Sequence, residues 1–285
     1  MIIDDLVKTM PASTNHRPPV RRVMRLVLWA LLVVFSLAPV AIFGLYAVSQ
    51  RWFYPLILPS EWTAAPLLRQ LRDPRTREAL VNSTIVALLV SSLSTLVAYP
   101  AARALELRLQ RWKGLVYALL FLPTVVPSVA TGIGLNILFL RVGLDGTLAG
   151  VALVHLIPVL PYSVLTLGGV FARYDPTYEQ QAQVLGAGHW YTFSRVTLRL
   201  IFPGLVVTGL LAFLISWSQY VLTLLIGGGR VVTLPILLFA TISGGNPTTT
   251  SVLALIFIAP LVLTIAFASR HLAATRSDGE EIVHQ

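Results

Sequence analysis

One polar segment between two long apolar runs, residues 178–188, carries the side chains best suited to binding another protein. Tyr178, Ala182 and Leu185 are spaced four and three residues apart, which places them on one face of a helix. Ala182 and Gly186 are small, so a partner can approach the backbone closely. The pattern predicts a short amphipathic docking helix. An ordinary solvated connector is the alternative interpretation.

The flanking residues carry signals for both ends of this helix. Asp175 can cap its N-terminus, and Pro176 suits the first helical position. Glu179 lies in the first turn, where the helix dipole favours an anion. The glycines that follow can end the helix. We therefore expect it to cover residues 176–187.

Nucleotide hydrolysis and covalent catalysis are not predicted from this chain. A phosphate-cradling loop needs Gly-Lys-Ser/Thr, but neither Lys8 nor Lys113 follows a glycine. The chain has no cysteine, which excludes disulfides, thiolate metal sites and thiol nucleophiles. It contains no His-Glu-x-x-His run and no serine nucleophile elbow. We expect no catalytic residue, no cofactor and no metal, so energy for moving a solute must come from another protein.

His155 is the one ionisable side chain expected deep inside an apolar segment, because Asp145 and Asp175 fall in loops. An ion-coupled carrier normally keeps acidic residues inside its spans. A lone histidine is weak support for a proton relay, and a neutral histidine bonded to a neighbouring helix explains it as well.

The composition indicates a membrane protein. The chain is 56% hydrophobic and only 12% charged, and its mean hydropathy is +0.78. A soluble domain is about one quarter charged, so this chain needs the bilayer as its solvent. The net charge of +9 does not indicate nucleic-acid binding, because the basic residues flank apolar runs.

Six segments are long and apolar enough to cross the hydrocarbon core as helices, within a permease domain over residues 26–269. The predicted spans are residues 26–48, 79–102, 115–140, 148–171, 204–226 and 251–269. The apolar run 234–242 is too short to span and is predicted to lie at the outer interface.

The remaining segments are predicted to lie outside the membrane. They are a disordered N-terminal tail over residues 1–25, a small folded external element within 50–78, the loop 172–203, and a C-terminal tail over 270–285. The loops on the side of the N-terminus carry more Lys and Arg than the others, which predicts cytoplasmic termini and a cytoplasmic 172–203 loop.

Two features of the apolar segments have more than one interpretation. The first run is longer than the core of a signal peptide, so we expect a retained helix rather than a cleaved leader. Proline pairs such as Pro123/Pro127 and Pro158/Pro161 indicate bent helices around a pathway. The alternative is that membrane helices simply tolerate proline.

The loop 172–203 resembles the coupling loop of permease subunits of binding-protein-dependent ATP-binding-cassette (ABC) importers. That loop carries Glu-Ala-Ala, two residues, Leu-Gly-Ala, then Val-x-Leu-Pro and Pro-Gly. The residues that match at the right spacing are Ala182, Leu185, Gly186, Ala187, Phe193, Val196, Leu198, Pro203 and Gly204. The chain departs from the motif in having Gln180 at the glutamate, Gln181 at the first alanine and Arg199 at the proline.

The resemblance implies an all-α membrane protein: a type I importer bundle of six transmembrane helices with a cytoplasmic coupling helix, in the bacterial inner membrane. It implies that Glu179, Gln180, Ala182, Leu185, Gly186 and Ala187 couple the chain to an ABC ATPase subunit. Gln180 can form a hydrogen bond there but no ion pair, and Glu179 can substitute for the family glutamate. ATP and Mg²⁺ are expected in that partner. A second permease and an extracytoplasmic binding protein complete the implied assembly.

A second match, over residues 212–221 and 233–235, resembles permeases for polyamines, thiamine, ferric iron and phosphonates. Many of those carry acids where this chain has Ser218 and Gln219, which weakens the case for a polycation. The residues predicted to line the pathway are Ser216, Trp217, Gln219 and Tyr220, with Asn136 and His155 as weaker candidates. Helix–helix hydrogen bonding is the alternative role of each.

The residues leave two further function classes open, an ion-coupled secondary carrier and a membrane scaffold or receptor without a transport path. The sequence does not identify the substrate. It does not distinguish a pair of identical permeases from a pair of different ones.

Overall fold

The computed structural model describes residues 19–49, 52, 56, 59 and 61–283 of the 285-residue chain. Within these residues the chain is helical, with one isolated antiparallel bridge between Ser49 and Trp62 and no strand. The helices are α2 Pro19–Ala47, α3 Ala65–Arg72, α4 Pro74–Leu107, α5 Lys113–Val125, α6 Ser128–Arg141, α7 Leu148–Phe171, α8 Thr177–Val184, α9 His189–Tyr191, the π-helix η1 Thr192–Thr197, α10 Leu198–Trp217, α11 Val221–Gly227, α12 Leu234–Ser243 and α13 Pro247–Val283.

Five helical segments in the described part of the chain are long and apolar enough to cross a membrane, and a sixth span requires counting α5 and α6 together. The prediction of one span over residues 115–140 needs correction, because these two helices meet at an angle of 89°. Pro127 follows the break and disfavours a helical conformation at Val126, which is extended with ψ 132°.

Other helix bounds differ from the sequence-based ones. The run predicted over 204–226 starts earlier, at His189, and is interrupted between Trp217 and Val221. α4 exceeds the predicted 79–102 at both ends, and α13 continues beyond residue 269 to Val283. α2 begins inside the predicted tail 1–25, whose residues 1–18 lie outside the described part of the chain. α7 has the predicted bounds 148–171.

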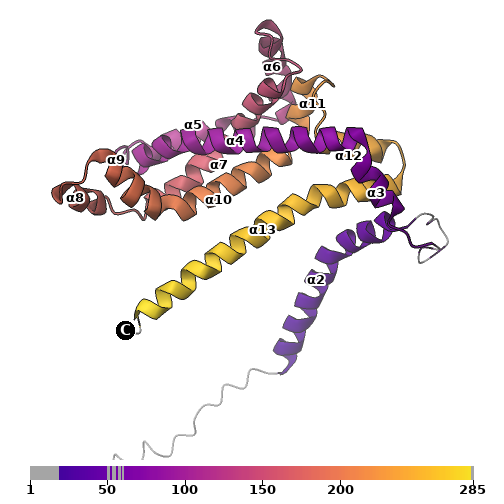
Figure 1. The fold of residues 1–285 in the computed structure, drawn as a ribbon, viewed down its shortest axis with the longest axis horizontal. Helices are drawn as coiled ribbons and strands as arrows, with labels where there is room; N and C mark the ends of the chain where they lie inside the picture. The colour runs from indigo at the N-terminus through magenta and orange to yellow at the C-terminus, as the bar shows by residue number, and fades with distance from the viewer. Residues whose placement is uncertain (1–18, 50–51, 53–55, 57–58, 60, 284–285) are drawn as a thin grey trace, which may run out of the picture.

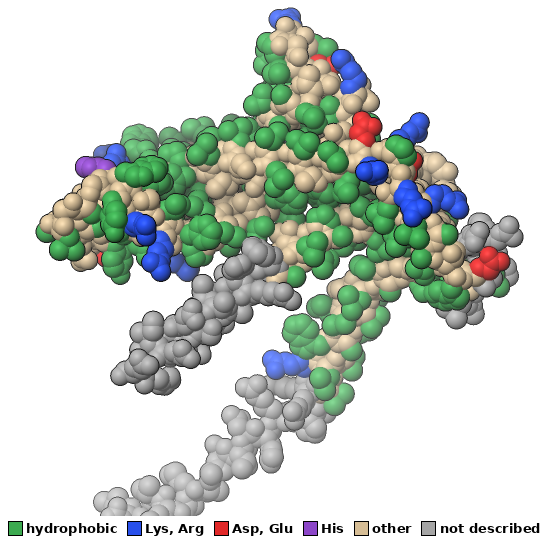
Figure 2. Space-filling model, in the orientation of Figure 1, with side chains coloured by type: hydrophobic (Ala, Val, Ile, Leu, Met, Phe, Trp, Pro, Cys, Tyr) green, Lys and Arg blue, Asp and Glu red, His purple; other side chains and the backbone are tan. Residues whose placement is uncertain are grey.

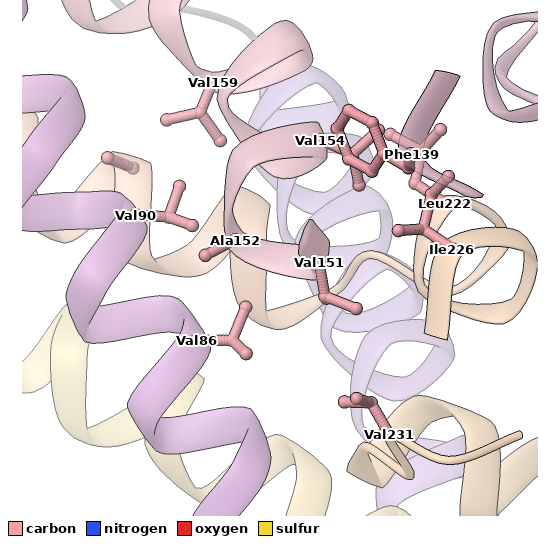
Figure 3. Close-up of a cluster of buried hydrophobic side chains, with 11 residues drawn as sticks. Val86, Val90, Phe139, Val151, Ala152, Val154, Val159, Leu222, Ile226 and Val231 are labelled. Carbon is pink, nitrogen blue, oxygen red and sulfur yellow. The ribbon is translucent and has the colours of Figure 1, made fainter. Parts of the chain in front are cut away.

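The centre of the molecule is formed by α4, α7 and α10, which pack on one another (Figure 1). Their contact surface is made of small and β-branched side chains, including Val86 and Val90 of α4 and Val151 and Ala152 of α7 (Figure 3). Such side chains allow helices to approach closely where the surrounding solvent is itself apolar. Ser91 illustrates the approach, since its hydroxyl donates across to a backbone carbonyl of α10 at 2.7 Å.

Apolar side chains cover the outside of the helices, and Lys and Arg side chains lie mostly toward the ends of the molecule (Figure 2). Most of the described side chains of α2 are exposed, and this helix packs against α13. In a bilayer this exposure carries no hydrophobic penalty. Figure 1 shows α8 and α9 at one end of the bundle and α3 and α12 at the other. α3 forms part of the external element predicted within residues 50–78.

Candidate functional site

The segment predicted to dock a partner forms helix α8, which covers Thr177–Val184 rather than the predicted 176–187. Asp175 caps its beginning, because one of its carboxylate oxygens accepts a hydrogen bond from the backbone N–H of Thr177 at 2.9 Å. Hydrogen bonds from the side chain and the backbone of Thr177 hold the pKa of Asp175 below its usual range. Pro176 precedes the first helical residue, as its missing N–H allows.

The end of α8 is a complete Schellman motif, in which two backbone bonds satisfy carbonyls of the last turn. The N–H of Gly186 donates to the carbonyl of Gln183 at 2.9 Å, and that of Ala187 donates to Ala182 at 3.0 Å. Gly186 has φ +88°, a left-handed conformation that other residues adopt only with strain. The glycine is therefore needed for the backbone to turn here.

Two apolar side chains project from this cap. Leu185 is 88% exposed and Val184 is 86% exposed. Gln180, the residue at the family glutamate position, is exposed on the same helix, whereas Ala182 and Ala187 are half-buried. The sequence predicted a role for Leu185 but not for Val184. An apolar residue next to Leu185 in a polar segment could have indicated a second exposed contact residue.

Glu179 points into the bundle. Its carboxylate accepts hydrogen bonds from the Arg103 guanidinium of α4 at 2.6 Å, from the Tyr174 hydroxyl at 2.6 Å and from the Thr197 hydroxyl of η1 at 2.7 Å. The side chain is only 14% exposed. These three partners belong to the chain itself, so the structure gives this carboxylate an internal role.

The pKa values of this cluster follow from its partners. Partial burial alone would raise the pKa of Glu179, but the hydrogen bonds from Tyr174, Thr197 and Arg103 outweigh it and lower that pKa. Burial, together with the bond to Glu179, raises the pKa of Tyr174 to about 12. At neutral pH the carboxylate is charged and the phenol keeps its proton to donate.

His155, a weaker candidate for the pathway, lies in the interior with 1% exposure. Its Nδ1 is 2.9 Å from the hydroxyl of Ser216, and its Nε2 is 2.9 Å from the hydroxyl of Thr223. Thr223 donates its own proton to the carbonyl of Gln219, so it must accept from Nε2–H. Nδ1 then accepts from Ser216. A neutral imidazole thus joins α7 to both sides of the break between α10 and α11.

Most of the other candidates also make contacts within the bundle. Trp217 is buried, and its indole N–H donates to the carbonyl of Phe257 at 3.1 Å. Asn136 donates to Asp145 at 2.8 Å and to a backbone carbonyl of α11 at 3.0 Å. The ring of Tyr220 stacks on that of Phe239, with centroids 4.2 Å apart. Helix–helix bonding, the alternative role, describes these contacts.

Among the pathway candidates, Gln219 lines a cavity. The cavity, of about 390 Å³, lies where α7 and α10 meet the break between α5 and α6. Its polar lining consists of uncharged side chains, namely Thr124, Ser128, Thr131, Tyr162 and Gln219. No acidic or basic residue lines it. Pro123 and Pro158, one from each of the two proline pairs, both line this cavity.

One buried acid was missed by the sequence analysis. Glu106, in the last turn of α4, is bonded by Lys113 and by the hydroxyl of Tyr117, the latter at 3.1 Å. Gly168 of α7 makes room, because a Cβ there would lie 2.1 Å from the Tyr117 oxygen. Glu106 lies beyond the predicted end of its span, so hydropathy alone did not predict that its side chain is buried. Across the described residues, His, Asp and Glu form no cluster of three suited to a metal ion.

Comparison with known proteins gives a consistent picture. Residues 93–277 match the family described as binding-protein-dependent transport system inner membrane component. The protein named as the 2-aminoethylphosphonate transport system permease PhnV of Salmonella typhi is 29% identical over 238 residues, which are 82% of this chain and 88% of that protein. The putrescine transport system permease protein PotI of Escherichia coli K12 is 26% identical, over 82% of this chain and 85% of that protein.

A third relative and two solved structures extend the comparison. The molybdenum transport system permease protein ModB of Mycobacterium bovis is 31% identical, over 63% of this chain and 78% of that protein. A crystal structure of a bacterial ABC transporter that imports alginate matches with a TM-score of 0.72 at 16% identity, covering 92% of this chain and 99% of that chain. The likeness to this crystal structure, at 16% identity, shows the fold alone. A further structure of an alginate importer, with a TM-score of 0.60 at 14% identity, contains an alginate-bound periplasmic protein.

Proposed function

Because this chain belongs to the family of binding-protein-dependent transport system inner membrane components, we propose that an ATPase subunit drives it through α8. The chain is the permease subunit of a binding-protein-dependent ABC importer, and its apolar helices embed it in the inner membrane. The named relatives are transport subunits, and neither a scaffold nor a secondary carrier is among them.

The exposed apolar tip of α8 carries this proposal. Val184 and Leu185 protrude from an otherwise polar helix, where water would surround them in the isolated chain. Their backbone is held by the Schellman motif, so the tip is presented in one conformation. Apolar side chains on a rigid polar element are typical of a protein contact. Gln180 is exposed on the same helix and supplies a hydrogen-bonding group there.

The proposed assembly follows from what the chain lacks. It has no phosphate-binding loop, so ATP and Mg²⁺ belong to the partner that receives α8. One chain presents one coupling helix, so a second permease, identical or different, serves the second ATPase subunit. An extracytoplasmic binding protein delivers the solute at the end opposite α8. The loop charges favour a cytoplasmic position for α8 and the two termini, and the cytoplasmic ATP supply supports the same position for α8.

We place the translocation path at the cavity lined by Gln219. The break between α5 and α6 and the proline-containing helix α7 meet there, and helix breaks at a solute site allow access to alternate between sides. Its polar groups are hydroxyls and an amide, which suit a small polar solute better than a polycation. Among polyamines, thiamine, ferric iron and phosphonates, the absence of acids in this lining argues against a polyamine. The similarity to the 2-aminoethylphosphonate permease favours a phosphonate.

A substrate screen tests that part of the proposal. The importer, purified with its binding protein, is assayed for uptake of 2-aminoethylphosphonate, putrescine, thiamine and ferric iron into liposomes. We expect uptake of the phosphonate and none of putrescine. Uptake of putrescine alone would contradict the inference from the uncharged cavity.

A substitution at the tip of α8 tests the docking role. Leu185→Asp should weaken capture of the ATPase subunit by about tenfold or more, because a charge replaces an apolar side chain at the centre of the contact. The matched control is Leu68→Asp, which changes an exposed leucine of α3 at the other end of the bundle. Equal capture by the two variants would contradict docking through α8.

A further inference from the structure

The Glu179 cluster joins the docking helix to the membrane bundle at a single carboxylate. Arg103 belongs to α4, Thr197 to η1, and Tyr174 to the loop between α7 and α8, so the donors come from three separate segments. We propose that Glu179 is a positioning residue that makes α8 move with α4 and η1, so that motion of the ATPase reaches the translocation helices. This inference rests on the proposed docking of α8.

α8 packs only slightly on the bundle, so its position depends strongly on the hydrogen bonds of the Glu179 carboxylate. α8 has eight residues and no fully buried side chain, and it packs against η1. A helix held by so few apolar contacts can tilt on the bundle when a partner pulls it. Three hydrogen bonds to one charged group resist such tilting, because bonds to an ionised acceptor are shorter and stronger than neutral ones.

The cluster connects α8 to two of the three central helices. Arg103 lies in α4, and its second nitrogen donates to the Tyr99 hydroxyl at 3.0 Å. Tyr99 packs edge-on against Phe193 of η1, with ring centroids 5.9 Å apart. η1 continues without interruption into α10. A displacement of α8 is thus carried to α4 through Arg103 and to α10 through Thr197.

The two faces of α8 have different proposed roles. Glu179 faces the bundle, while Leu185 and Val184 face away from it. A change at the outward residues should alter capture of the ATPase, and a change at the inward residue should alter what its motion accomplishes. The neighbouring residue Gln180 stands at the position of the family glutamate, so the acid of this chain lies one residue earlier and serves the inward contact.

The test uses the whole importer, reconstituted with its ATPase, second permease and binding protein. Glu179→Gln keeps the shape of the side chain but removes its charge, and Tyr174→Phe removes one donor. We expect both variants to assemble and to capture the ATPase normally. Solute imported per ATP hydrolysed should fall on the order of tenfold for Glu179→Gln, within the usual range of coupling between two sites, and less for Tyr174→Phe.

The matched control is Gln110→Glu, the reverse exchange at an exposed position between α4 and α5, outside the docking helix. Its import per ATP should stay within about twofold of the parent, as is usual for surface changes. An unchanged ratio in Glu179→Gln would overturn the inference. Normal ATPase capture by Leu185→Asp would instead contradict the docking proposal, so the two failures are distinguishable.

A cross-link separates a mechanical tie from a role in folding. The chain has no cysteine, so Arg103→Cys with Glu179→Cys introduces the only thiol pair in the permease. The reduced double variant should hydrolyse ATP with poor import. A short bifunctional thiol reagent should restore import per ATP, because it replaces the lost bonds by a covalent link. A cross-linked complex that stays uncoupled would contradict the inference.

Discussion

Glu179 and His155 each hold several helical elements together, but in opposite surroundings. Glu179 lies at the rim, where an arginine and two hydroxyls surround a charged carboxylate. His155 lies in the interior, where two hydroxyls bracket a neutral ring. A charge is stable only where a counter-charge and donors accompany it, so the buried position suits a group that both donates and accepts. Both residues hold neighbouring helical elements together through hydrogen bonds.

Removal of the hydrogen bonds of His155 should have the largest effect on stability. His155→Leu leaves the hydroxyl of Ser216 without its acceptor and should lower the free energy of unfolding by about 2 kcal/mol. Thermal unfolding in detergent measures the loss. His189→Leu, at an exposed histidine of α9, is the matched control and should change little. Equal stability of the two variants would show that the buried contacts contribute nothing.

The cap of the docking helix should be the next most sensitive position. Gly186→Ala forces a side chain into a left-handed conformation and should cost about 1 kcal/mol, confined to the end of α8. Gly188→Ala is the control, because Gly188 has φ −67° and open space around it. Amide hydrogen exchange of α8 should rise in the first variant only. Similar exchange in both would argue against the cap.

Acid should release the hydrogen bonds of Glu179. The pKa of Glu179 is lowered in the folded state, so its contribution is full above the ordinary glutamate value of about 4.3 and is lost as the pH falls through the lowered value. Exchange protection of α8, corrected for intrinsic rates, should be constant from neutral pH to about 5. It should fall only at more acid pH. Glu179→Gln should lack this acid-dependent step.

The smallest effect is expected at Gln180. Gln180→Glu restores the family glutamate at an exposed position, so the free energy of unfolding should stay within about 0.5 kcal/mol. Titration with the purified ATPase subunit should show binding about threefold tighter, as expected for one added ion pair at an interface. Weaker binding would mean that the ATPase surface facing this residue has no basic group.

Much of this arrangement was predictable from local pattern. Hydropathy predicted the α7 span at its observed bounds, and the spacing of residues 178–188 predicted a helix there. The motif around Leu185 and Gly186 indicated the family from the sequence alone. Proline pairs predicted bends, but not that Pro127 would mark an 89° break. The angle of a kink depends on what the helices on its two sides pack against. The residues near the proline do not encode that packing.

The roles of the polar side chains were less predictable. Trp217 and His155, which were predicted to line a pathway, are buried between helices, and Gln219 lines the cavity. Their role in transport stays a prediction. A helix turns by about 100° per residue, so a small shift in its rotation moves a side chain from a cavity to a core. The sequence contains the helix but not its rotation relative to its neighbours.

The amino-acid sequence alone determined that this chain lies in a bilayer, that it cannot hydrolyse ATP through a phosphate-binding loop, and that a short polar helix interrupts its apolar spans. These properties depend on composition and on neighbours along the chain. Only the tertiary structure decided that Glu179 turns inward while Leu185 turns outward. Arg103, seventy-six residues away from Glu179 in sequence, makes that difference, because a carboxylate faces the cation that folding brings within 2.6 Å.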